Sequence, residues 1–88
     1  MAQNIKFTKT AQQEYQAWKL ENPAKAERID RLLKAIQDDP FNGIGKPEPL
    51  KYELSGWWSR RIDDGNRLIY KVAKDTIIVL QVKFHYRK

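Results

Sequence analysis

Apolar and polar residues alternate along the chain, first at the period of a strand and then at the wider period of a helix. Residues 4–8 alternate well enough to predict a short first strand. Beyond them, apolar side chains recur on one helical face, at Ala11, Tyr15 and Trp18. Thr10 and Gln13 resemble a capping box and predict the start of this helix.

A second helix is predicted almost without a break. Asn22 and Pro23 indicate where the first helix stops and the second starts, because asparagine caps helices well and proline suits the first helical position. The second helix carries a single apolar stripe, formed by Ala26, Ile29, Leu32, Leu33 and Ile36. Pro40 and the two aspartates before it end this helix. Since so few residues separate the two helices, we expect an antiparallel helical hairpin.

The second half of the chain is typical of a loop followed by strands. Two glycines and two prolines place residues 42–49 in a loop. Strand-like segments follow, at residues 57–62, 67–73 and 76–86. In the last segment every even position from Ile78 to Phe84 is apolar, whereas the odd positions become polar toward His85. We therefore expect the even face to be core and the odd face to be open.

These elements predict an α+β fold in a single domain spanning residues 1–88. The two-helix hairpin should pack on one face of a small, largely antiparallel sheet. No apolar run approaches the roughly 20 residues needed to span a bilayer. The first residues are polar and do not resemble a signal peptide. We therefore expect a cytoplasmic protein that does not act at a membrane.

The composition narrows the chemistry. There is no cysteine and there is one histidine, so disulfides, thiolate chemistry and a multi-histidine zinc site are excluded. The tight acidic pairs at residues 38–39 and 63–64 fall where turns are expected, which favours solvated turns over a carboxylate magnesium site. We expect no cofactor and no metal, and catalysis, if present, by protons and fixed charges.

The net charge of +6 is unevenly placed. Residues 1–42 carry seven basic against six acidic side chains, whereas residues 43–88 carry ten against five. A polyanionic partner would meet the second half of the chain. A solvated basic surface would have the same composition, so charge alone does not decide between them.

A turn signal places two arginines opposite each other. Residues 63–65, Asp-Asp-Gly, fit a three-residue hairpin loop with Gly65 in the left-handed conformation. Arg61 would then pair directly with Arg67, an unfavourable arrangement of like charges. A bound phosphate would explain the pair. The alternatives are neutralisation by Asp63, Asp64 or Glu53, or a two-residue loop with a different register.

Further candidates gather near these arginines. His85 lies toward the end of the open face, and Glu48 stands between two prolines with Lys51 close by. A carboxylate, an imidazole and several cations suit cleavage of RNA by its own 2′-hydroxyl. That reaction needs a base, an acid and positive charge around the phosphoryl oxygens.

Four stretches of the chain carry a family resemblance. They are GKPEPLK at residues 45–51, LSGWWSRRI at 54–62, NRLIY at 66–70 and FHY at 84–86. Together they resemble the YoeB branch of the RelE toxin superfamily, over nearly the whole chain. The resemblance implies a RelE-like microbial ribonuclease fold and the toxin of a type II toxin–antitoxin system. Such a toxin enters the A site of the 30S ribosomal subunit and cleaves the mRNA there without a metal.

The resemblance also implies partners and residue roles. A YefM-like antitoxin would block the active site, the toxin would form a homodimer, and operator DNA would be bound only through the toxin–antitoxin complex, which represses its own operon. Glu48 would be the general base and His85 the general acid. The residues stabilising the phosphate would be Lys51, Arg61 and Arg67.

Tyr86 is implied to orient the substrate or the leaving group. Strict alternation puts it on the core face, so this role requires the strand end to twist. Two positions depart from the family pattern, with Asn66 in place of a histidine and Gly65 in place of a glutamate. Both departures affect fine positioning, and neither removes a principal candidate.

The tandem tryptophans fall on opposite faces of their strand. Trp58 is the better core candidate, and Trp57 would either stack on a base or fill an interface. Two other functions are compatible with a basic chain of this size. One is a non-catalytic RNA- or ribosome-binding module of the same fold. The other is a DNA-binding regulator, disfavoured because Glu27 and Asp30 interrupt the basic face of the second helix.

Overall fold

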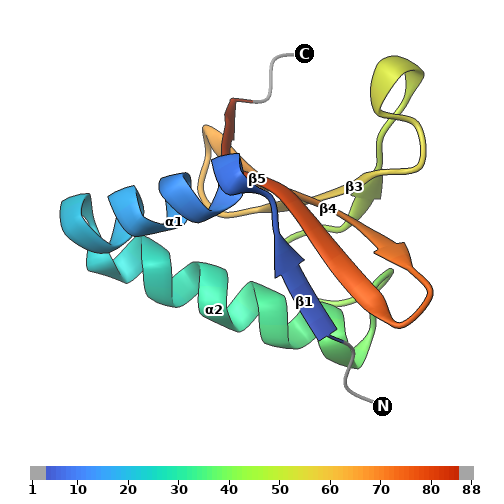
Figure 1. The fold of residues 1–88 in the computed structure, drawn as a ribbon, viewed down its shortest axis with the longest axis horizontal. Coiled ribbons are helices and arrows are strands. Elements are labelled where there is room, and N and C mark those ends of the chain that lie inside the picture. The colour runs from blue at the N-terminus through green and yellow to red at the C-terminus, as the bar shows by residue number, and fades with distance from the viewer. Residues whose placement is uncertain (1–3, 86–88) are drawn as a thin grey trace.

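A computed structural model describes residues 4–85 of the chain. The helices are α1 (Lys9–Glu21) and α2 (Pro23–Asp38), with a short 3-10 helix, η1 (Tyr52–Leu54). The strands are β1 (Asn4–Phe7), β2 (Glu48–Pro49), β3 (Trp58–Arg61), β4 (Asn66–Ala73) and β5 (Thr76–His85). They form one sheet in the order β1-β5-β4-β3-β2, in which only the β1–β5 pair is parallel (Figure 1). The predicted α+β fold is confirmed.

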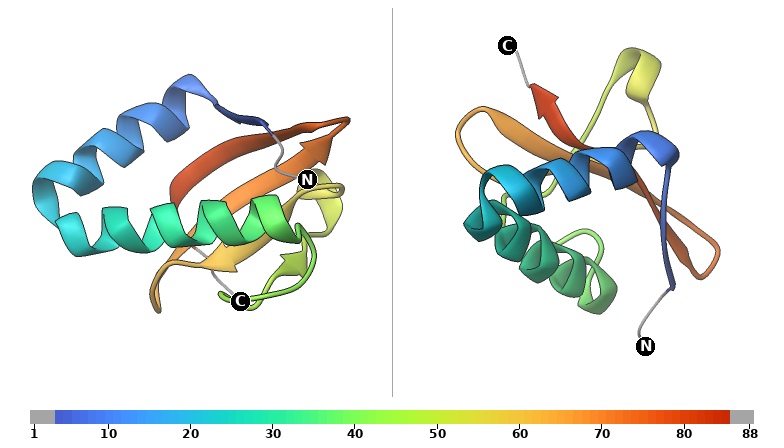
Figure 2. Two further views of the ribbon diagram at one scale, coloured as in Figure 1. Left: turned by 90° about the horizontal axis from the view of Figure 1, so that it is seen from below. Right: turned by 60° about the vertical axis from the view of Figure 1, so that its left-hand side comes forward.

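The helical hairpin lies on one face of this sheet, with the two helices side by side (Figure 2). All five residues of the predicted apolar stripe of α2 are buried. Pro23 occupies the start of α2, as predicted, although the side chain of Asn22 makes no capping hydrogen bond. Neither helix in the described part of the chain is long and apolar enough to cross a membrane.

The predicted cap of the first helix was wrong by two residues. Thr8, not Thr10, is the N-cap, and its hydroxyl oxygen accepts from the backbone N–H of Ala11. The same hydroxyl donates to the carbonyl of Leu80 on β5 at 2.7 Å. Thr8 therefore ties the helix start to the sheet, a link that local sequence does not reveal, while Thr10 is already helical.

Strand β5 does not keep one face in the core, so the predicted even-face core was wrong. Ile77 and Val79 are fully buried at its start, and Val82 is fully buried further on. The buried positions thus change from odd to even within the strand.

The cause is an irregular pairing between β4 and β5. Tyr70 pairs with Val79, whereas Arg67 pairs with Phe84, so β5 uses two more residues than β4 over the same span. Extra residues of this kind form β-bulges, which shift the alternation of the bulged strand. Phe84, predicted to be core, is instead the cross-strand partner of Arg67 and shares its face of the sheet. The prediction that His85 shares the open face with the arginines was wrong, because His85 pairs with Asn66 and so lies on the face opposite to Arg67, at the strand end.

Candidate active site

The predicted pairing of the two arginines is confirmed, since Arg61 lies directly opposite Arg67 between β3 and β4. The predicted turn geometry was wrong, because Gly65 is not left-handed. The carboxylate of Asp63 fixes the turn instead. Its Oδ1 accepts from the backbone N–H groups of Gly65 at 2.9 Å and Asn66 at 2.7 Å. A side chain that binds backbone two and three residues ahead imposes the turn without a left-handed residue.

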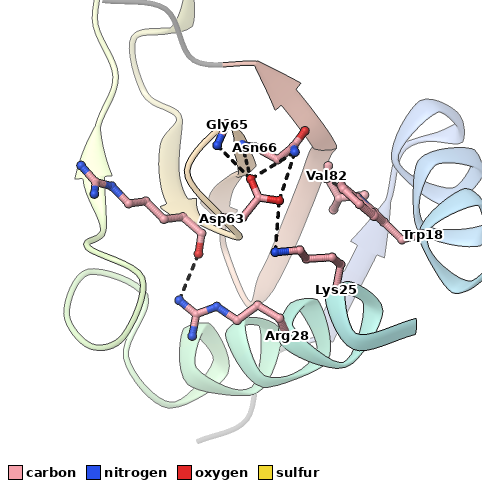
Figure 3. A network of polar contacts seen from close by, with 8 residues as sticks. Trp18, Lys25, Arg28, Asp63, Gly65, Asn66 and Val82 are labelled. Atoms are coloured by element: carbon pink, nitrogen blue, oxygen red, sulfur yellow. Dashed lines mark hydrogen bonds and ion pairs between the residues drawn. The ribbon is translucent and has the colours of Figure 1, made fainter. Parts of the chain in front are cut away.

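The turn is also attached to helix α2. Lys25 Nζ lies 3.4 Å from Asp63 Oδ2, and Arg28 Nη2 donates to the carbonyl of Arg61 at 3.1 Å. Figure 3 shows both side chains reaching from the helix toward the hairpin. The hairpin that carries the two arginines is therefore held to the helical layer at two points.

The charge state of Asp63 follows from this network. Burial alone would raise its pKa, but hydrogen bonds from Gly65, from Asn66 and from Lys25 outweigh burial and hold the pKa below its ordinary value of 3.8. Asp63 is thus engaged by the turn and by Lys25.

Glu48 is the carboxylate that contacts Arg67. The end of the predicted loop forms the two-residue strand β2, in which Glu48 pairs with Ser59 of β3. Arg67 is only 5% exposed, and its Nη1 lies 3.4 Å from both Glu48 Oε1 and Ser59 Oγ. The flanking prolines hold this short strand at the sheet edge, where proline is tolerated because its missing N–H faces outward. About half of the Glu48 side chain remains exposed (48%).

Glu48 also lines a surface hollow of about 590 Å³. The other charged residues around it are Lys51 and His85. Its remaining lining is apolar or aromatic, from Pro49, Leu50, Tyr52, Leu54 and Phe84. The structure therefore brings the β2 loop and the end of β5 around one opening, with Arg67 touching Glu48.

Not every predicted site residue lies in this hollow. Arg61 is not one of its lining residues; it is partly buried as the cross-strand partner of Arg67, and within residues 4–85 its Nε has no hydrogen-bond acceptor. Tyr86 lies outside the described residues. No cluster of three or more potential metal-ligating side chains occurs in the described part of the chain.

Helix α1 holds the end of β5 that carries His85. Glu14 Oε1 accepts from the backbone N–H groups of Val82 at 2.8 Å and Lys83 at 3.2 Å. Trp18 Nε1 donates to the carbonyl of Val82 at 2.8 Å. These contacts fall on the irregular part of β5, so they satisfy backbone groups that a regular ladder would pair. Sequence reasoning missed Glu14, whose partners lie more than 65 residues away.

A second missed residue is Arg60, which alternation places on the opposite face from Arg61. It is fully buried on the helix side of the sheet. Its guanidinium donates to the carbonyls of Asp39, Asn42 and Ile44, at 2.6, 3.0 and 3.1 Å. Arg60 thus fixes the loop that leads from α2 to Glu48. The available signal was alternation, which puts Arg60 on the same strand face as Trp58, the predicted core candidate.

The tandem tryptophans separate only in part as predicted. Trp58 packs against the core while remaining partly exposed, and its ring lies 4.8 Å from that of Phe41. Trp57 is also partly buried, with the ammonium of Lys71 4.7 Å from its ring centre. The proposed contact of Trp57 with a base or an interface remains a prediction.

The arrangement described so far defines a class. A helical hairpin packed on a five-stranded sheet is the fold of the RelE-type toxins. In this chain a carboxylate, a lysine and a histidine also lie around one hollow. Residues 7–86 match the family described as the YoeB-like toxin of bacterial type II toxin-antitoxin systems. The chain belongs to this family and is a toxin of a type II toxin–antitoxin system.

Individual relatives are similar to this chain over nearly their whole length. The chain is 48% identical to toxin YoeB of Streptomyces coelicolor over 82 residues, which cover 93% of this chain and 98% of that one. The solved YoeB dimer from Staphylococcus aureus superposes with a TM-score of 0.91 at 37% identity, covering 98% of this chain and all of that one. The heterotetrameric YoeB–YefM complex from the same organism gives a TM-score of 0.88 at 37% identity, with the same coverage.

Proposed function

We propose that this toxin is a ribosome-dependent endoribonuclease that cleaves mRNA in the A site of the 30S subunit, without a metal. The observation that carries the proposal is the grouping of Glu48, Lys51 and His85 around one hollow, with Arg67 in contact with Glu48. A base, an acid and cations within one opening meet the requirements for attack by a 2′-hydroxyl on the neighbouring phosphate.

Each group has a role in the proposed reaction. Glu48 takes the proton of the 2′-hydroxyl as its oxygen bonds to phosphorus, and His85 gives a proton to the 5′-oxygen as the P–O bond to it breaks. The products are a 2′,3′-cyclic phosphate and a 5′-hydroxyl. The developing negative charge on the phosphoryl oxygens is stabilised by Lys51, Arg61 and Arg67.

Tyr86, which follows His85 directly, would orient the substrate or the leaving group. This role stays a prediction, because Tyr86 lies outside the described residues.

The partners proposed for this chain follow from its relatives. A YefM-like antitoxin would bind the toxin, as YefM binds YoeB in the solved Staphylococcus aureus complexes. In this proposal the antitoxin blocks the hollow. Two toxin chains would pair, as in the YoeB dimer. Operator DNA would be bound only through the toxin–antitoxin complex, which would repress its own operon.

A non-catalytic RNA- or ribosome-binding module of the same fold is the second candidate. The basic surface and the aromatic residues serve it equally well, and only the Glu48–His85 pair favours catalysis. The two functions therefore separate at these two side chains.

The experiment is cell-free translation of a defined message, with cleavage sites mapped by primer extension. Wild-type protein should cut at ribosome-occupied codons. Glu48→Gln and His85→Asn should each slow cleavage by roughly 10²–10⁴-fold, the usual contribution of a general acid or base. The exposed carboxylate of Glu27 on α2 offers a matched control, since Glu27→Gln should cut normally. If folded wild-type protein leaves the message intact, the nuclease function is wrong and the binding module replaces it.

A further inference from the structure

The hollow beside Glu48 has two chemically different flanks. Its charged flank consists of Glu48, Lys51 and His85. Its other flank is apolar and aromatic, and the proposed acid–base chemistry does not use it. The residues of this apolar flank are Pro49, Leu50, Tyr52, Leu54 and Phe84. A site for a phosphate alone would have no need of it.

Tyr52 is the most unusual member of the apolar flank. It is 90% exposed, and its backbone has a φ of +59°. Left-handed backbone is unfavourable for a bulky residue, and an exposed ring gains no packing in return. An outlier of this kind at the rim of a hollow indicates a functional constraint.

The backbone around Tyr52 forms a hydrogen-bonded turn. Tyr52 begins η1, which stands out from the edge of the sheet (yellow in Figure 1). The N–H of Ser55 donates to the carbonyl of Tyr52 at 3.0 Å, and the N–H of Leu54 donates to the carbonyl of Lys51 at 3.2 Å. Lys51 and Tyr52 are therefore presented on one tight turn, the cation next to the aromatic ring.

We propose that the apolar flank is a nucleobase-binding subsite, with Tyr52 as its stacking platform. The inference rests on the proposed ribonuclease function and adds a site for a base adjoining the scissile phosphate. Unpaired RNA bases are commonly bound by stacking on aromatic side chains, next to cations that hold the backbone. The lining of this flank offers few hydrogen-bonding groups, so the subsite holds a base by its ring face and discriminates weakly between bases.

The test is a double-mutant cycle, in which one change is made in the protein and the other in the message. One message carries a 2′-deoxynucleotide at the attacking position, which prevents cleavage and allows binding to be measured alone. Two matched messages additionally lack the base on one or the other side of the scissile phosphate. The affinity of the toxin for ribosomes programmed with each message is then measured with wild-type protein, Tyr52→Phe and Tyr52→Leu.

Wild-type protein should bind one abasic message more weakly by about 5- to 150-fold, the equivalent of one stacked base. Tyr52→Phe should retain this discrimination, and Tyr52→Leu should lose most of it. Leu20→Ala, at an exposed apolar residue of α1 outside the hollow, should behave as wild type. Because no message is cut, the result does not depend on whether the toxin is a nuclease.

A further variant separates the strained backbone from the ring. Tyr52→Gly should be at least as stable as wild type, because glycine adopts positive φ freely, yet it should lose the discrimination. Equal discrimination by wild type and Tyr52→Leu would overturn the proposal. The proposal would also be overturned if Tyr52→Phe lost as much discrimination as Tyr52→Leu, because the hydroxyl and not the ring would then be the functional group. If Tyr52→Leu weakens only antitoxin binding, the flank belongs to a protein partner and the base subsite is wrong.

Discussion

Replacing Glu14 should disturb both the stability of the toxin and its proposed active site, although Glu14 lies on α1 and outside the hollow. Its carboxylate accepts from the backbone N–H groups of Val82 and Lys83, at 2.8 and 3.2 Å. Both groups belong to the irregular segment of β5, two or three residues before His85. Removing the carboxylate leaves these donors without their partner and frees the segment to adopt a regular register.

The magnitude follows from the burial of the two donors. A hydrogen bond to a charged group contributes about 1.5–3 kcal/mol. Val82 is fully buried, so its N–H loses the whole contribution, whereas Lys83 is partly exposed and water replaces part of the loss. We therefore expect Glu14→Ala to lower the free energy of unfolding by about 2–4 kcal/mol. That is a large share of the roughly 4–13 kcal/mol typical of a domain of this size.

The assay is urea unfolding followed by tryptophan fluorescence, together with cleavage measured well below the midpoint of thermal unfolding. Glu14→Gln keeps an acceptor oxygen and should lose about 1 kcal/mol, the difference between a charged and a neutral acceptor. Glu27→Ala on α2 is the control for losing an exposed carboxylate. Cleavage by folded Glu14→Ala should fall, since the strand end carrying His85 is no longer held. A loss of stability no larger than that of Glu27→Ala would refute this account of the bulge.

Three further predictions concern the fold around the site. Arg60→Met should lower the free energy of unfolding by about 3–5 kcal/mol in urea, because it removes a buried guanidinium that donates to three backbone carbonyls. A loss below 1 kcal/mol would contradict the structural role assigned to Arg60. Gly45→Ala should destabilise by roughly 1–3 kcal/mol in the same assay, since Gly45 has a φ of +86° and an added Cβ would lie 2.8 Å from Leu32 Cδ2. Gly56→Ala, at a φ of +94° with nothing within 4 Å, separates backbone strain from the clash and should cost less. Because the pKa of Asp63 is lowered in the folded state, its carboxylate adds stability above pH 3.8, and this stability is lost as the pH falls through the folded-state pKa. Asp63→Ala should therefore make the free energy of unfolding fall less steeply with pH on the acid side. An unchanged slope would contradict the stabilising role of the Asp63 carboxylate.

The features predicted correctly from the sequence are those with local causes. The apolar stripe of α2 and the start at Pro23 depend on residues within a few positions of one another. The pairing of Arg61 with Arg67 follows from the length of the turn between them, so it was predicted correctly although the predicted turn conformation was wrong. Loop length fixes register whichever residue shapes the turn.

The features that sequence reasoning missed have distant causes. The change of face within β5 depends on its pairing with β4 and on Glu14 of α1, neither of which is visible in the alternation of β5 itself. Arg60 is buried because carbonyls of a loop 16–21 residues earlier in the chain surround its guanidinium. The composition of the hollow is missed as well, since the apolar alternation of β5 assigned Phe84 to the core face, whereas its pairing with Arg67 places it on the other face.

The contact between Glu48 and Arg67 gives the proposed reaction an order of events. The guanidinium of Arg67 is almost fully buried, whereas half of the Glu48 side chain is exposed, so the carboxylate is the partner that is free to move. A phosphate entering the hollow competes with the carboxylate for the same guanidinium, and a guanidinium matches two phosphate oxygens well. In the proposed mechanism, binding of the phosphate releases Glu48 from Arg67, and the carboxylate then accepts the proton of the 2′-hydroxyl. In the proposed mechanism the base becomes available only when the phosphate is already held, and the two-residue strand β2 sets how far that carboxylate can move.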